Sequence, residues 1–149
     1  MTNAELAAIL SDTSKRVSGD IVWQPDEDHS FSVEFLVQVT SDPGWPLVVR
    51  GSYNGLVPAV TYALILKNVG RIYALDMGRE HHNPNCRFIG DVHKHKWSEQ
   101  LRDKEAYVPD DITAHASDPV SVWEQFCQEA SIRHVGHLHL PPPIQKELF

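Results

Sequence analysis

Two histidines separated by one residue, His93 and His95, lie in the segment 90–99, with Lys94 and Lys96 interleaved between and after them. Alternate side chains of a β-strand point to the same face, so both imidazoles should face one target, with Cα atoms roughly 6 to 7 Å apart. An imidazole exchanges a proton near neutral pH and is also a common metal ligand. The spacing therefore predicts a functional site for proton transfer or for a metal ion.

The metal alternative has its own pattern. His93, His95 and Glu99 follow the spacing H-x-H-x-x-x-E, which is that of the first metal motif of cupins. A metal site of this kind needs a further ligand from elsewhere, which His137 or His139 could supply, as could His81 or His82. We nevertheless expect no metal and no other cofactor, because Glu99 need not face the histidines and the neighbouring lysines carry like charge.

Several other residues near this segment could assist proton transfer on a phosphate. The window 79–104 is rich in Lys and Arg, within a chain whose net charge is −7. Asp76 ends an expected strand and could orient an imidazole, and Tyr107 could act as an acid, although an aromatic residue there is more often part of a core. The residues expected to bind the substrate are Arg87, Lys94, Lys96, His81 and His82.

The hydrophobic pattern predicts the elements that position this site. The chain has 149 residues, of which 42% are hydrophobic, enough for one core. Strict alternation from Phe31 to Val39 indicates a half-buried antiparallel strand, and short apolar runs with turn residues between them predict further strands at 47–53, 60–66, 71–77 and 87–97. Helices are expected at 4–10 and after Asp118, which can act as an N-cap before Pro119.

These elements predict an α+β fold. It consists of a single twisted antiparallel sheet of about five or six strands, with the N-terminal helix and the C-terminal helix packed on one face. Residues 1–140 would form one domain, and the prolines from Pro141 to Pro143 would begin an extended tail over 141–149.

Composition excludes some classes of protein. An acidic chain is a poor match for a broad footprint on nucleic acid or on an anionic membrane. No apolar run approaches the length of a membrane span. Cys86 and Cys127 form no disulfide framework, so the cytoplasm is the expected compartment. No nucleotide-binding glycine loop and no serine-hydrolase motif is present.

The order of these features resembles the TumE-type toxins of bacterial toxin-antitoxin pairs, over residues 30–132. The resemblance rests on Tyr73-Ala74-Leu75-Asp76, a loop with His and Asn, Gly90-Asp91-Val92-His93-Lys94-His95, and a helix beginning Asp118-Pro119. It implies the sheet-plus-helix architecture of RelE-like ribonucleases. It also implies an active site at Asp76, His93, His95 and Tyr107.

The resulting functional prediction is a toxin-like ribonuclease of a bacterial or phage defence system. His93 and His95 would be its metal-independent acid/base pair, acting on RNA that is free or ribosome-bound, with an antitoxin or another protein as partner. The alternative is a non-enzymatic binding protein of the immunity, antitoxin-like or counter-defence kind, whose acidic surface mimics nucleic acid. A second alternative is a metal-dependent, cupin-like enzyme that uses His93, His95 and Glu99.

Overall fold

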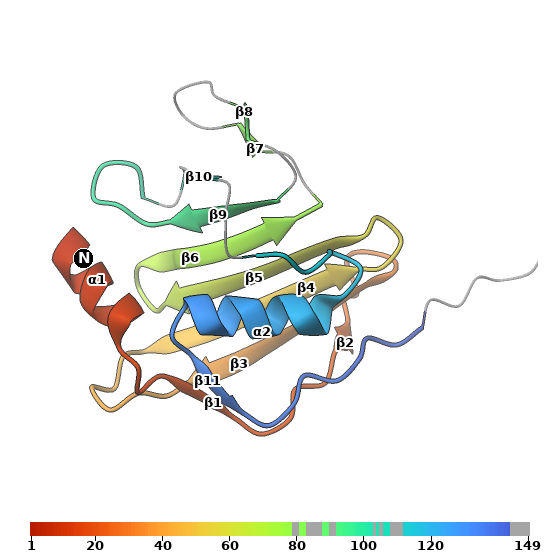
Figure 1. The fold of residues 1–149 in the computed structure, drawn as a ribbon, viewed down its shortest axis with the longest axis horizontal. Coiled ribbons are helices and arrows are strands. Elements are labelled where there is room, and N and C mark those ends of the chain that lie inside the picture. The colour runs from red at the N-terminus through yellow and green to blue at the C-terminus, as the bar shows by residue number, and fades with distance from the viewer. Residues whose placement is uncertain are drawn as a thin grey trace, which may run out of the picture.

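The fold is built on one large antiparallel sheet (Figure 1). The computed structural model of the chain describes residues 1–78, 81–82, 88–89, 92–102, 104, 106–107 and 112–143. Within them, the sheet has seven strands in the order β10-β9-β6-β5-β4-β3-β2. Their bounds are β2 Gln24–Pro25, β3 Ser32–Val39, β4 Leu47–Asn54, β5 Ala59–Leu66, β6 Gly70–Met77, β9 Val92–Lys96 and β10 Ala106–Tyr107.

The predicted fold class is confirmed, and the sheet is larger than expected. The two edge strands, β2 and β10, are only two residues long, and such short strands leave little periodicity to read in the sequence. Two small sheets add to the large one. β1 (Arg16–Ser18) pairs in parallel with β11 (Arg133–Val135), and β7 (His81–His82) pairs with β8 (Phe88–Ile89).

Both predicted helices are present. α1 (Asn3–Ser11) begins after Thr2, whose hydroxyl accepts from the Glu5 backbone N–H while the Glu5 carboxylate accepts from the Thr2 N–H, a capping box. α2 (Pro119–Glu129) begins after Asp118, whose carboxylate accepts from the Ser121 N–H. No helix in the described part of the chain is long and apolar enough to cross a membrane.

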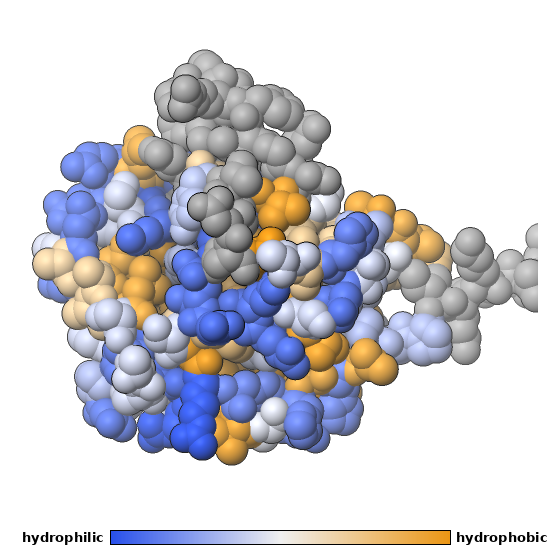
Figure 2. Space-filling view, viewed as in Figure 1, coloured by the Kyte–Doolittle hydropathy of each residue, from blue (hydrophilic) through white to orange (hydrophobic). Residues whose placement is uncertain are grey.

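α2 covers one face of the sheet (Figure 1). Its outer surface is hydrophilic (Figure 2), whereas Trp123 and Phe126 are buried against the sheet. The Tyr62 hydroxyl of β5 donates to the Pro119 carbonyl across 2.6 Å and so ties the start of the helix to the central strands. Around this contact lies an aromatic core formed by Trp23, Phe35, Tyr62, Tyr73, Trp123 and Phe126.

A buried lysine, Lys15, binds the carbonyl oxygens at the C-terminal end of α1. The Lys15 side chain is fully buried, and its ammonium donates to the carbonyl oxygens of Ile9, Leu10 and Asp12 at 2.6, 3.1 and 2.7 Å. These carbonyls belong to the last turn of the helix and its cap, where the chain itself leaves acceptors without intrahelical donors. Burial lowers the pKa of Lys15 to about 8, and the nearby Asp12 charge only partly opposes this shift.

Replacing Lys15 by Met should lower the free energy of unfolding by about 2 kcal/mol, because carbonyls at the helix end lose their donor. Urea unfolding at pH 7 measures this, with Lys67→Met as the control, since Lys67 is exposed. An equal stability of the two variants would contradict the role of Lys15.

The same comparison has a predicted pH dependence. Between the folded pKa of about 8 and the ordinary value of 10.5, the unfolded chain binds the Lys15 proton more tightly than the folded chain. The stability that Lys15 confers should therefore rise with pH across this window, and the gap between wild type and Lys15→Met should widen. A constant gap from pH 7.5 to 10 would argue against a lowered pKa.

Candidate functional site

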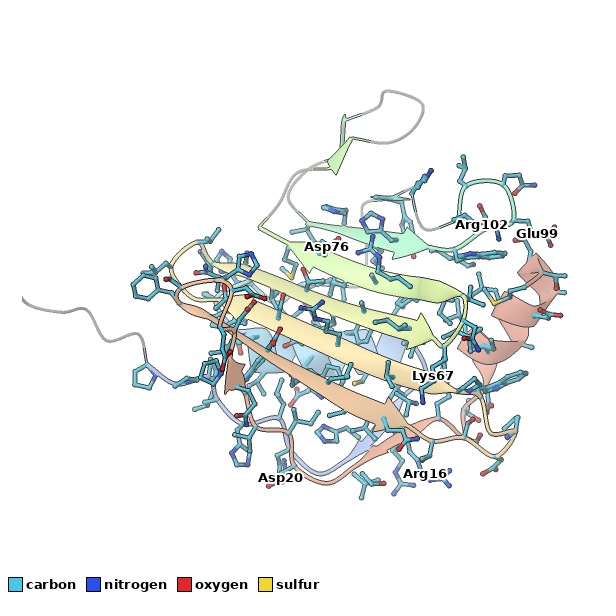
Figure 3. The ribbon with its side chains drawn as sticks, turned by 180° about the vertical axis from the view of Figure 1, so that it is seen from behind. Arg16, Asp20, Lys67, Asp76, Glu99 and Arg102 are labelled. Carbon is cyan, nitrogen blue, oxygen red and sulfur yellow. The ribbon has the colours of Figure 1, made fainter. Side chains whose placement is uncertain are left out.

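The candidate site lies on the sheet face opposite α2, where β6 meets β9 (Figure 3). Asp76 of β6 is directly opposite His93 of β9 in the antiparallel register, and His95 follows on the same face. One carboxylate oxygen, Asp76 Oδ2, lies 3.4 Å from His93 Nε2 and 3.0 Å from His95 Nε2. The other oxygen, Oδ1, accepts a 2.7 Å hydrogen bond from the Thr61 hydroxyl of β5. The predicted grouping of Asp76, His93 and His95 is therefore present in the structure.

The site is buried, and the Asp76 carboxylate is ionised. The side chains of His93, His95 and Asp76 are 2%, 3% and 13% exposed. Burial alone raises the pKa of Asp76, but the hydrogen bonds from the two histidines and Thr61 outweigh it and hold this pKa well below its usual range. An ionised carboxylate only accepts hydrogen bonds, so each Nε2 that bonds to it without a metal carries the proton.

The same three side chains form a possible set of metal ligands. One ligand atom from each of Asp76, His93 and His95 lies within 4.8 Å of the other two. Two imidazole nitrogens and one carboxylate oxygen form a ligand set that is found in mononuclear metal enzymes. The geometry therefore permits either a proton-transfer site or a metal centre.

A β-bulge brings Arg71 to this site. The pairing of β5 with β6 shifts between Leu64 and Ile65, so that Tyr73 lies opposite Leu64 but Arg71 lies opposite Ile65. Strict alternation would point Arg71 away from Asp76, and the extra residue Ile72 reverses this. Arg71 Nη1 consequently lies 3.8 Å from Asp76 Oδ2.

A groove of about 870 Å³ crosses this face of the sheet and includes the site. Its floor is made of short side chains from the central strands, and the loop between β2 and β3 contributes one wall. The lining residues are Asp26, Asp28, His29, Ser30, Ser32, Arg50, Ser52, Asn54, Thr61, Ala63, Ile65, Arg71, Asp76, His93 and His95. The volume is within the usual range for a small-molecule site.

The structure corrects the predicted grouping of Lys94 and Lys96 with the histidines. Lys94 is fully buried on the α2 side, where its ammonium lies 3.1 Å from a Glu129 carboxylate oxygen and 5.5 Å from the centre of the Tyr73 ring. Lys96 also faces away from the histidines and lines a cleft beside α1. The reason is the two-residue period of the strand, which sends odd and even residues of β9 to opposite faces.

Tyr107 and Glu99 also lie away from the histidines. Tyr107 is opposite Lys94 in the pairing of β10 with β9, and it lines the cleft that contains Lys96. The Glu99 carboxylate accepts from the Asn3 N–H at 2.7 Å, which places it beside α1 (Figure 3). Asp76 therefore occupies the position that the cupin-like prediction assigned to Glu99.

The remaining predicted residues fall elsewhere. His137 and His139 are held at Asp20, which accepts from the His137 N–H at 3.0 Å and lies 3.2 Å from His139 Nε2. Neither joins the histidines of β9 in the groove lining. Arg87 lies outside the described residues. The structure describes His81 and His82 only as the backbone of β7.

Thr61, Arg71 and Arg50 are among the groove residues that were not singled out from the sequence. Alternation in β5 could have placed Thr61 on the polar face, but not in contact with Asp76. Arg50 faces the groove by the same alternation in β4 and lies 3.1 Å from a Glu34 carboxylate oxygen. The orientation of Arg71 depends on a bulge for which the sequence has no clear signal.

The fold and the site together define an α+β protein with a buried Asp-His-His cluster on the open face of an antiparallel sheet. By sequence, the chain belongs to the family of unknown function DUF6978, whose model matches residues 1–132. The match includes every strand of the large sheet, α2 and the cluster. Neither a curated protein nor a solved structure shows a significant match to the chain.

Thr61→Val should destabilise the protein by about 2 kcal/mol, because a buried ionised carboxylate loses a hydrogen bond. The change keeps the shape of the side chain, so packing is largely preserved. Thr13→Val, at an exposed position, is the control in a thermal or urea unfolding series. If the two variants are equally stable, the Thr61 hydroxyl does not support Asp76.

Proposed function

We propose that Asp76, His93 and His95 bind a divalent metal ion and that the protein is a metal-dependent enzyme whose substrate occupies the groove. The observation that carries this proposal is the convergence of both Nε2 atoms on one carboxylate oxygen, at 3.4 and 3.0 Å. Ligands bound at about 2.0 to 2.1 Å with angles of roughly 90 to 109° lie about 2.9 to 3.4 Å from one another. The two observed N–O separations fit an ion bound to the carboxylate and to each imidazole, and all three ligand atoms lie within 4.8 Å of one another.

The sequence argument against a metal does not apply to this arrangement. It rested on the charges of Lys94 and Lys96 and on the uncertain direction of Glu99. Lys94 is paired with Glu129 on the opposite side of the sheet, and Asp76 supplies the carboxylate. Within the described part of the chain, the cation that contacts Asp76 is Arg71, whose Nη1 lies 3.8 Å from Asp76 Oδ2.

A metal site with three protein ligands is typical of a catalytic centre rather than a structural one. Structural zinc sites are closed by four protein ligands, whereas a catalytic ion keeps positions for water and substrate. The groove beside the three side chains provides room for both. A metal ion there would polarise a carbonyl or phosphoryl oxygen or lower the pKa of a bound water. Thr61 would act as a positioning residue, through its hydrogen bond to the second oxygen of Asp76.

Protein purified without a histidine tag should contain close to one equivalent of zinc, manganese, iron or another transition metal. Asp76→Asn and His95→Ala should each lower this content at least tenfold, because groups that only hydrogen-bond to the ligands cannot replace a lost ligand. His139→Ala is the matched control, since His139 lies at Asp20, outside the groove. Elemental analysis and titration of the stripped protein measure the outcome. Failure of stripped wild type to bind any of these ions would refute the metal centre.

A metal-independent ribonuclease is the second candidate function. It is favoured by the hydrogen bonds of both imidazoles to one ionised carboxylate, which fix the Nε2–H tautomer and make Nδ1 the proton acceptor of a neutral ring. Arg71 and Arg50 would stabilise the phosphate in place of the predicted lysines. This candidate agrees with the resemblance to TumE-type toxins.

RNA cleavage by metal-stripped protein tests this second candidate. If it holds, wild type should cleave RNA in the presence of a chelator, alone or with ribosomes, and His93→Gln should lose at least a hundredfold in rate. His139→Ala again serves as the control. Cleavage that needs added metal supports the first candidate instead. If the protein neither binds metal nor cleaves RNA, the predicted non-enzymatic binding role is favoured.

A further inference from the structure

We propose that the groove binds a small anionic substrate, a phosphate ester or a carboxylate, with its negative group at Arg71, beside the Asp-His-His cluster where it reacts, and with the rest of the substrate extending toward Arg50. This inference rests on the proposed metal centre and adds the class of substrate. It is drawn from the sheet register, the side chains of the groove floor and the balance of charge.

The sheet register sets the distance between Arg50 and His95. Arg50 pairs with Ala63, Ala63 with Ala74, and Ala74 with His95, so these four residues form one row across β4, β5, β6 and β9. Adjacent strands lie about 4.8 Å apart, which places the ends of the row roughly 14 Å from each other. Both residues between them are alanines. Ala63 lines the groove whereas Ala74 is fully buried, so the open space of this row lies over Ala63, on the Arg50 side.

The neighbouring row supplies polar contacts along this space. Ser52 pairs with Thr61, Thr61 with Asp76, and Asp76 with His93. Ser52 and Thr61 line the groove with short hydroxyl side chains. Such a floor suits hydroxyl or other polar groups of a substrate lying between Arg50 and the cluster. The described lining includes no Phe, Trp or Tyr on which nucleic-acid bases could stack, which favours a small molecule over a single strand of RNA.

Arg71 is the residue best placed to bind the negative group near the reacting end. Its side chain is 31% exposed, and the bulge in β6 turns it into the groove. Its Nη1 atom lies 3.8 Å from Asp76 Oδ2, which is longer than a hydrogen bond. A guanidinium group has five N–H donors in a planar fork, and this geometry matches two oxygens of a phosphate or carboxylate group.

The charge of the groove makes anion binding depend on the metal. Three carboxylates, those of Asp26, Asp28 and Asp76, line the groove with two guanidinium groups. The His29 ring and the Asp28 N–H both contact the Asp26 carboxylate. Glu34 adds a fourth carboxylate, 3.1 Å from the Arg50 guanidinium. Among the described residues the metal-free groove therefore has an excess of negative charge, which a divalent ion at the cluster offsets. An anion should bind the metal-loaded protein and not the stripped one.

Calorimetric titration of the metal-loaded protein with inorganic phosphate, and separately with acetate, tests the inference. Wild type should bind at least one of the two anions, and removal of the metal should weaken this binding at least tenfold. Arg71→Gln should also weaken it at least tenfold while keeping the metal, and Arg71→Lys should fall between, because the charge remains but the fork is lost. Tighter binding of phosphate indicates a phosphate ester, and tighter binding of acetate a carboxylate.

The control is Arg133→Gln, since Arg133 is exposed on β11, outside the groove lining. Equal anion affinity in wild type, Arg71→Gln and Arg133→Gln would overturn the inference, and so would a metal-loaded wild type that binds neither anion. Metal content is measured on each sample beforehand. A protein that holds metal but no anion refutes only the substrate class, whereas a protein that holds no metal refutes both proposals.

Discussion

The packing of α2 against only one face of the sheet is the constraint on which the rest of the structure depends (Figure 1). Trp123 and Phe126 bury that face, and every strand beneath them must turn apolar residues toward the helix. Because side chains alternate along a strand, the residues between them are forced onto the opposite face. The open face therefore carries the side chains that alternate with the core residues along each strand. In this protein the groove on that face is lined by short polar side chains, an alanine, an isoleucine, two arginines, three histidines and acidic groups.

Asp76 is what turns this open face into a site. A buried carboxylate is costly unless it is hydrogen-bonded, and here Thr61, His93 and His95 satisfy it from two neighbouring strands. The same contacts keep the group ionised and hold two imidazoles in defined positions. A buried charge that is held in this way marks a candidate functional site more strongly than it supports stability.

The two lysines of β9 lie on the opposite face of the sheet from the two histidines of the same strand. The sequence places them beside the histidines, yet the strand turns them toward the other side. There Lys94 connects the sheet to α2 through Glu129, and Lys96 lines the cleft beside α1. The positive charge on the open face is instead provided by Arg50 of β4 and Arg71 of β6. The chemistry available to the site thus differs from what the linear order of residues suggests.

The sequence by itself determined the α+β class, both helices, the Asp118 N-cap, and the shared face of His93 and His95, because these follow from local periodicity and capping. It also identified Asp76 as a possible partner of an imidazole. Only the tertiary structure decided which residues meet. The register of β6 with β9 set Asp76 opposite His93, the bulge in β6 turned Arg71 into the groove, and contacts with α1 drew Glu99 away. These outcomes depend on pairings between segments distant in the chain, and local sequence patterns do not encode such pairings.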